Sequence, residues 1–167
     1  MAFYRLLFCV VAALIALPTM AGAQTQKAAL MTALPGTWSC TFHGPKGTRT
    51  GTITFTSVND NWLQATSKIS AYDTTPAHEG IGLFGYDSKK GEYVSMSGNT
   101  VAGNDDWGVG IAKASPAATT VTFDGGYPPD PTQEKNSYTL SGSTLTSTSS
   151  WTEKGKAMSG HGSCTKQ

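Results

Sequence analysis

The chain has 167 residues, with 12 basic and 11 acidic side chains, so its formal net charge is only +1. No basic stripe or run of like charges occurs, which argues against nucleic acid and anionic membrane surfaces as main partners. The length suffices for one domain with a hydrophobic core, and no linker separates a second domain.

The first 23 residues (1–23) have the features of a secretory signal peptide. Arg5 precedes an apolar run at 6–17, and Ala21-Gly22-Ala23 supplies the small residues of a cleavage site. The run is shorter than the roughly 20 residues of a spanning helix. We therefore expect cleavage before Gln24, no membrane span afterwards, and export to the periplasm or the extracellular space.

The rest of the chain has the pattern of one all-β domain at 35–167, preceded by a lead-in at 24–34 that is compatible with a short helix. Segments rich in Thr, Ser, Val, Ile and aromatic residues recur about every ten residues, separated by Gly, Pro and Asn-Asp turns. Strands are predicted at 37–43, 48–57, 62–70, 79–86, 91–97, 107–113, 119–124, 136–141, 143–152 and 156–165. This spacing predicts a single antiparallel up-and-down β-barrel of about ten strands.

Two-residue alternation assigns the strand faces. Trp62 is expected outside or at the rim, because Leu63, Ala65 and Ile69 share the opposite face of its strand. Inward faces are predicted to carry Trp38, Cys40 and Phe42; Ile53 and Phe55; Trp107, Val109 and Ile111; and Leu145, Ser147, Ser149 and Trp151.

Cys40 and Cys164 are the two cysteines that remain when the signal peptide, which contains Cys9, is removed. An even pair in an exported protein most often forms one disulfide. The two residues fall on the first and last predicted strands, which pair when an up-and-down barrel closes. We expect a disulfide that locks this closure; the alternative is a bond that only tethers the C-terminal tail.

Two short stretches resemble known families. Gly36-Thr37-Trp38 resembles the Gly-x-Trp signature of calycin barrels, which include lipocalins, fatty-acid-binding proteins and avidins. The stretch from Glu79 to Asp87, followed by Glu92-Tyr93-Val94, resembles a bacterial family of exported or cytosolic domains of unknown function. Those domains are similar to nitrobindin, a ten-stranded barrel that binds haem. The resemblance implies a calycin-like barrel from Leu34 onward, with His161 on the final strand as a haem ligand.

Strand parity argues against that haem site. If Cys164 points inward, His161 three residues earlier points outward unless a bulge intervenes. Ala77 also stands where the nitrobindin pattern has a histidine. We therefore expect no cofactor, with haem as a minor alternative.

No catalytic or metal-binding motif is recognisable. His43, His78 and His161 belong neither to a nucleophile elbow nor to a metal-ligand pattern. The expectation is a protein that is not an enzyme and has no catalytic residue and no metal site.

A ten-stranded barrel is wider than its side chains easily fill, which favours an interior site for a small, largely apolar molecule. The alternative function is contact with a protein partner, as an envelope or inhibitor module, through the Gly125–Asn136 loop. Ser147 and Ser149 would add hydrogen-bonding groups to the interior, and Trp38 could instead plug the closed end. The candidate ligand-binding residues are Trp38, Phe42, Phe55, Trp107, Tyr138 and Trp151.

Overall fold

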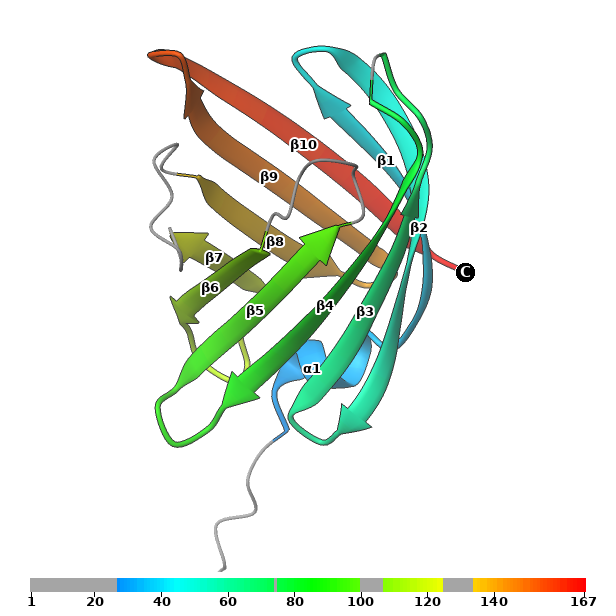
Figure 1. Cartoon of the computed structure of the whole chain (residues 1–167). Helices are drawn as coiled ribbons and strands as arrows, with labels where there is room; N and C mark the ends of the chain where they lie inside the picture. The colour runs from blue at the N-terminus through cyan, green and yellow to red at the C-terminus, as the bar shows by residue number, and fades with distance from the viewer. Residues whose placement is uncertain (1–26, 74, 100–106, 125–133) are drawn as a thin grey trace, which may run out of the picture.

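The computed structural model describes residues 27–73, 75–99, 107–124 and 134–167 (Figure 1). Within these ranges the chain forms one short helix and ten antiparallel strands, which curve into a nearly closed barrel. The elements are α1 (Ala29–Ala33), β1 (Gly36–Gly44), β2 (Gly47–Asn59), β3 (Trp62–Ile69), β4 (His78–Asp87), β5 (Glu92–Asn99), β6 (Trp107–Lys113), β7 (Thr120–Asp124), β8 (Lys135–Ser141), β9 (Thr144–Glu153) and β10 (Lys156–Lys166). All strand ends agree with the predicted ends to within two residues, and the all-β barrel prediction is confirmed.

The strands form one sheet in the order β6-β5-β4-β3-β2-β1-β10-β9-β8-β7. The first and last strands, β1 and β10, pair with each other as barrel closure requires. Within the described residues, no β-ladder joins β6 to β7. The barrel therefore has a seam between β6 and β7, at the middle of the chain rather than at its ends.

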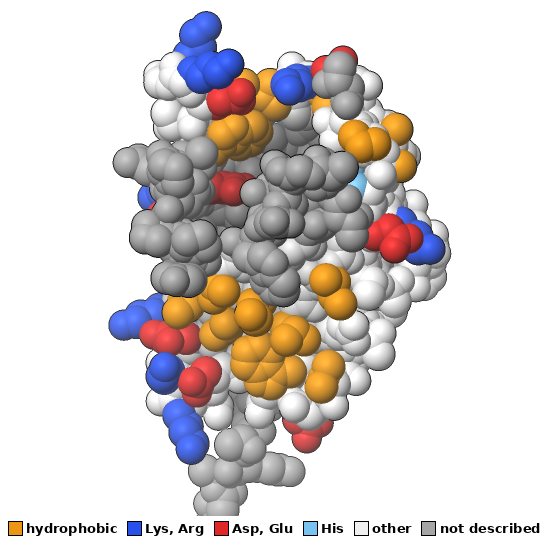
Figure 2. Space-filling model, in the orientation of Figure 1, with side chains coloured by type: hydrophobic (Ala, Val, Ile, Leu, Met, Phe, Trp, Pro, Cys, Tyr) orange, Lys and Arg blue, Asp and Glu red, His pale blue; other side chains and the backbone are white. Residues whose placement is uncertain are grey.

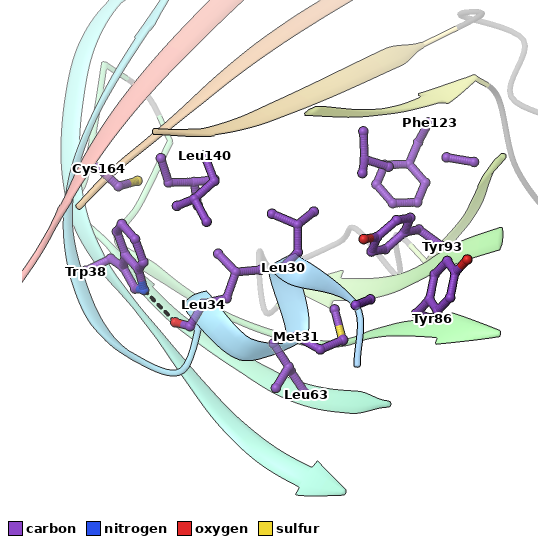
Figure 3. Packing of buried hydrophobic residues seen from close by; sticks show 14 of the residues in the cluster. Leu30, Met31, Leu34, Trp38, Leu63, Tyr86, Tyr93, Phe123, Leu140 and Cys164 are labelled. Carbon is purple, nitrogen blue, oxygen red and sulfur yellow. Dashed lines mark hydrogen bonds between the residues drawn. The ribbon is translucent and has the colours of Figure 1, made fainter. Parts of the chain in front are cut away.

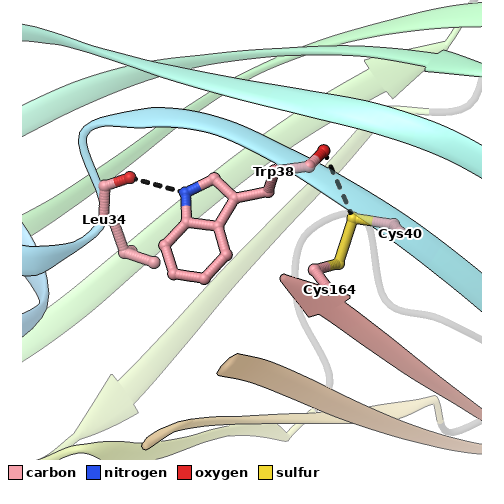
Figure 4. Close-up of a disulfide and its surroundings, with 4 residues drawn as sticks. All are labelled: Leu34, Trp38, Cys40 and Cys164. Atoms are coloured by element: carbon pink, nitrogen blue, oxygen red, sulfur yellow. Dashed lines mark hydrogen bonds between the residues drawn. A yellow bond between two sulfur atoms is a disulfide. The ribbon is translucent and has the colours of Figure 1, made fainter. Parts of the chain in front are cut away.

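Cys40 and Cys164 are direct cross-strand partners and form a disulfide, with their Cα atoms 4.0 Å apart (Figure 4). The bond joins positions that are 124 residues apart in sequence. The last strand is not a loose tail, because β10 pairs with β9 as well as with β1. The predicted disulfide between the first and last strands is confirmed.

The expected faces of the first two strands are present. Trp38 and Cys40 are buried on the inner face, and the register places Ile53 opposite Trp38 and hence on the same face. The outer face carries threonines, whose hydroxyls bond across the strands; Thr37 Oγ1 lies 3.1 Å from Thr54 Oγ1. Threonine suits such positions because its branched carbon favours the extended backbone.

The predicted inner face of the sixth strand is wrong. Ile111 pairs with Val94 and is 54% exposed, whereas the next residue, Ala112, is buried opposite Tyr93. Tyr93 is fully buried, so its cross-strand partner must face the interior too. Trp107 pairs with Gly98, and this register gives position 107 the outward parity of Ile111; the Trp107 side chain lies outside the described residues.

The buried core lies at one end of the barrel, around α1 (Figure 3). Leu30 and Met31 of α1 are buried there, in a cluster that includes Trp38, Leu63, Tyr86, Tyr93, Phe123, Leu140 and Leu145. A helix of five residues is not stable alone, so tertiary contacts must hold it in place. It lies within the 24–34 lead-in. Among the described residues, no helix combines the length and the apolar composition that crossing a bilayer requires.

Candidate functional site

The barrel contains a cavity of about 270 Å³ above the buried core. Side chains from α1 and from strands on both sides of the disulfide contribute to its lining. The apolar lining residues with inward register are Leu30, Leu34, Ile53, Phe55, Ala65, Phe84, Tyr138 and Leu145; Ile81, Leu83 and Met96, whose register is outward, also border the cavity. A mainly apolar cavity of this kind is typical of sites for small organic ligands.

The floor of the cavity is formed by Leu30 and Leu34, at α1 and its C-terminal end. The Trp38 indole N–H donates to the Leu34 carbonyl oxygen at 2.8 Å, which fixes that end of the helix to β1 (Figure 4). Lys166 Nζ donates to the Ala33 carbonyl at 2.8 Å, and the Ala29 amide donates to the Pro116 carbonyl at 2.7 Å. These bonds use backbone groups that the short helix cannot satisfy internally, and they hold the floor rigid.

One wall of the cavity is made of small residues. Ser67 of β3 lies opposite Gly80 of β4, and Gly82 lies opposite Ser97 of β5. These four residues and Ser95 all belong to the lining. Glycine and serine at inward positions leave space that larger side chains would fill, so this wall accounts for much of the cavity.

The outer face of the same wall carries apolar side chains that would ordinarily face a core. Ile81 is 55% exposed and Leu83 is 39% exposed, and both belong to β4. Met96 of β5 and Ile111 of β6 continue this exposed group (Figure 2). At Gly80 and Gly82 of β4 and at Ser95 and Ser97 of β5, therefore, small residues face the cavity, while larger apolar residues of β4, β5 and β6 face outward.

Tyr138 places a phenol in the otherwise apolar part of the lining. Burial raises the pKa of Tyr138 above its ordinary value, and the nearby negative charge of Glu134 raises it further. The hydroxyl is therefore protonated at neutral pH and able to donate or accept a hydrogen bond.

The structure separates the predicted ligand-binding residues into groups. Phe55 and Tyr138 line the cavity, whereas Trp38 is fully buried beneath its floor. Phe42 and Trp151 lie on the inner face but outside the lining. Trp107 has the outward register described above, which does not support a place in the cavity.

The serine hydroxyls of the cavity were predicted on the ninth strand, but they lie on other strands. Ser147 and Ser149 lie on the inner face, opposite Tyr138 and Asn136, but neither belongs to the lining. The lining serines are on β3 and β5 instead. Alternation alone could not identify them, because Val94 and Met96 have the stronger apolar signal of an inner face.

His161 lies opposite His43 on the outer face, where the two rings stack with centroids 4.7 Å apart. No bulge reverses the parity of β10 at this point, so His161 does not face the interior. Within the described residues, no group of three or more His, Cys, Asp or Glu side chains could hold a metal ion. Residues 125–133 of the predicted partner-binding loop lie outside the described residues.

Comparison with known proteins identifies a family and a fold. A family model described as "Protein of unknown function (DUF1579)" matches residues 23–140. No curated protein matches the chain. A redesigned beta barrel is similar with a TM-score of 0.50 and 15% identity, over 82% of this chain and 94% of that one. Another redesigned beta barrel, mFAP1 bound to DFHBI, has a TM-score of 0.48 and 16% identity, over 81% and 97% of the two chains.

Proposed function

Because the chain belongs to the family described as Protein of unknown function (DUF1579), whose description states no activity, we propose a function from the cavity itself. The barrel binds one small, largely apolar molecule in its interior and does not transform it. The observation that carries this proposal is the cavity of about 270 Å³, with its floor on α1 and its apolar wall from β2, β3, β4, β8 and β9.

The size of the cavity supports a small organic ligand. It lies near the lower end of the roughly 300–1,000 Å³ found for ligand pockets, and well above the roughly 150 Å³ that accommodates benzene. Each Å² of apolar ligand surface that is buried contributes about 25 cal/mol. After the costs of association, a ligand of this size can reach an affinity on the order of micromolar.

The lining supports binding rather than catalysis. Tyr138 is its one ionisable side chain among the described residues, and burial keeps its hydroxyl protonated. General acid–base or nucleophilic catalysis requires a group whose pKa lies near the working pH, or an activated nucleophile. The described lining provides neither.

The proposal includes export and a calycin-like barrel. Export is supported by the apolar run at 6–17 and by the Cys40–Cys164 disulfide, since structural disulfides persist in oxidising compartments. The calycin-like assignment is supported by the Gly-x-Trp stretch at the start of β1, where Trp38 closes one end of the barrel.

Filling the cavity tests the proposal. Ala65 faces the cavity between Phe55 and Gly82, so Ala65→Leu occupies the space that the ligand needs. Gln64→Leu adds a leucine at the preceding position of β3, which faces outward opposite Leu83 and does not line the cavity, and is the matched control. With the uncharged fluorescent probe N-phenyl-1-naphthylamine, we expect saturable binding to the wild type and to Gln64→Leu, and loss of binding in Ala65→Leu.

Thermal unfolding of the three proteins shows whether each variant is folded. Absence of saturable binding in the wild type, or unchanged binding in a folded Ala65→Leu protein, would contradict an interior site.

A further inference from the structure

Aromatic rings cover strand glycines at five places among the described residues of this barrel. A Cβ atom at Gly162 would lie 2.6 Å from Cδ1 of Phe42, and one at Gly160 would lie 3.7 Å from Cζ3 of Trp151. Because glycine has no Cβ, a flat ring can approach the strand backbone closely at these positions. The five pairs are Gly47 with Tyr72, Gly85 with Trp62, Gly110 with Phe123, Gly160 with Trp151, and Gly162 with Phe42.

Gly80 and Gly82 line the cavity and have no such ring against them; Gly51 and Gly108 also lack a ring, but neither of them lines the cavity. The nearest atom to a Cβ at Gly80 would be the Ser67 hydroxyl oxygen, at 2.5 Å. The three nearest atoms to a Cβ at Gly82 all belong to the backbone of Met96 and Ser97. Both glycines line the cavity, so a flat ring inside the cavity can approach this stretch of β4 without meeting a side chain of Gly80 or Gly82.

Serine hydroxyl groups lie on both sides of Gly80 and Gly82 of β4. Ser67 on β3 faces Gly80, and Ser97 on β5 faces Gly82. Strands β3 and β5 are two strand spacings apart, about 10 Å. A flat ring system against β4 would therefore have a hydrogen-bonding group near each edge.

The lining offers no partner for a charged ligand. None of the described lining residues is Lys, Arg, His, Asp or Glu. Two cations on the inner face are placed elsewhere: Arg49 lies over the Phe42 ring and Lys166 over the Trp38 ring. A carboxylate in the cavity would lose part of its hydration without gaining a counter-charge, which is unfavourable.

From the bare glycines, the flanking serines and the uncharged lining, we propose that the ligand is a planar, uncharged aromatic molecule. It stacks against Gly80 and Gly82, and a polar substituent at its edge bonds to the hydroxyl of Ser67 or Ser97. This inference rests on the proposed function and adds the chemical class of the ligand.

Three probes of similar size test the class with the disulfide-bonded protein. They are 2-naphthol, which is planar and uncharged at pH 7; decahydro-2-naphthol, its saturated and non-planar counterpart; and 2-naphthoate, which is planar and anionic. In competition with N-phenyl-1-naphthylamine, we expect 2-naphthol to bind at least about tenfold more tightly than either of the others, a difference of about 1.4 kcal/mol.

Two variants test the contacts. Gly80→Ala adds a methyl group where the ring would lie, and its closest neighbour, the Ser67 hydroxyl, can rotate away. Gly108→Ala is the matched control, because Gly108 is an inward strand glycine outside the lining and a Cβ there would meet only Ser97 Oγ, at 3.8 Å. We expect Gly80→Ala to abolish the preference for 2-naphthol over its saturated analogue and Gly108→Ala to keep it.

Ser67→Ala and Ser97→Ala add a readout that general damage to the fold would not give. One of the two should weaken 2-naphthol binding by about fivefold, the loss expected for one hydrogen bond, and both should leave naphthalene binding unchanged. If the saturated analogue or 2-naphthoate competes as well as 2-naphthol, the ligand class is wrong while interior binding stands. If none of the probes binds, the proposed function itself fails.

Discussion

Gly110 lies directly beneath the ring of Phe123: a Cβ atom at Gly110 would be 3.0 Å from Cδ1 of Phe123. The two residues belong to β6 and β7, which no ladder joins within the described residues. Phe123 is buried and also packs edge-on against Phe84 and Tyr138. Side-chain packing therefore closes the barrel wall where backbone hydrogen bonds do not.

The first prediction concerns this seam. Gly110→Val places two methyl groups against the Phe123 ring and should destabilise the protein by about 1–3 kcal/mol, as overpacking of a core does. Gly108 lies two residues earlier on the same face, and a Cβ atom there would meet only Ser97 Oγ, at 3.8 Å, so Gly108→Val should change stability by no more than about 0.5 kcal/mol. Urea unfolding of both variants measures the difference. Equal unfolding midpoints would show that the Phe123 contact is not needed for closure.

The second prediction concerns the disulfide. Cys40 and Cys164 enclose most of the folded chain, so the double variant Cys40→Ala, Cys164→Ala should lose up to about 4–5 kcal/mol of unfolding free energy in the chain-entropy model. Adding a reductant to the wild type should lower its urea midpoint as well. The same reductant should have no effect on the double variant. A wild type whose stability is insensitive to complete reduction, verified by thiol labelling, would argue against this role.

The third prediction concerns alkaline pH. Burial, together with the neighbouring Tyr86, raises the pKa of Tyr93 from about 10 to about 12. The unfolded chain therefore releases this proton at lower pH than the folded protein does. The stabilisation is complete below about pH 10 and is lost as the pH rises through about 12.

Tyr93→Phe removes the titrating hydroxyl, which donates to the Pro116 carbonyl at 3.4 Å, and keeps the buried ring. Guanidinium unfolding at a series of pH values should therefore show a shallower loss of stability above pH 10 in Tyr93→Phe than in the wild type. Parallel pH profiles for the two proteins would refute the assignment.

The sequence was sufficient to predict the barrel because its turns and alternating segments are local signals. Trp38, Cys40 and Ile53 lie on the predicted faces, and Trp62 packs on the outer face against Gly85. The disulfide followed from the placement of two cysteines on strands that must pair. The strand faces depend on near neighbours along the chain, and the disulfide depends on closure of the barrel. Both can be predicted from the sequence.

The cavity wall could not be predicted in the same way. Alternation separates two faces of a strand but does not say which one is inside. For β6 the apolar set was assigned to the interior, and Ile111 is instead exposed. The inward face of these strands is fixed by the pairing of the buried Tyr93 with Tyr86 and Ala112, and that pairing depends on the tertiary structure. The floor was missed for a similar reason, because Leu30 and Leu34 belong to a helix too short to have a clear period.

The position of the seam also has a consequence for the connectivity of the molecule. The connector at 114–119 is the stretch of backbone that crosses between β6 and β7. A single nick there would leave the oxidised protein in one covalent piece, running from β7 to β10, through Cys164 and Cys40, and on from β1 to β6. In that molecule the order of the strands along the covalent chain is the same as their order in the sheet, and both new chain ends lie at the seam. The nicked, oxidised protein would thus have the strand order of a circular permutant of the barrel, with the disulfide in place of a peptide link, and reduction would divide it into fragments of six and four strands.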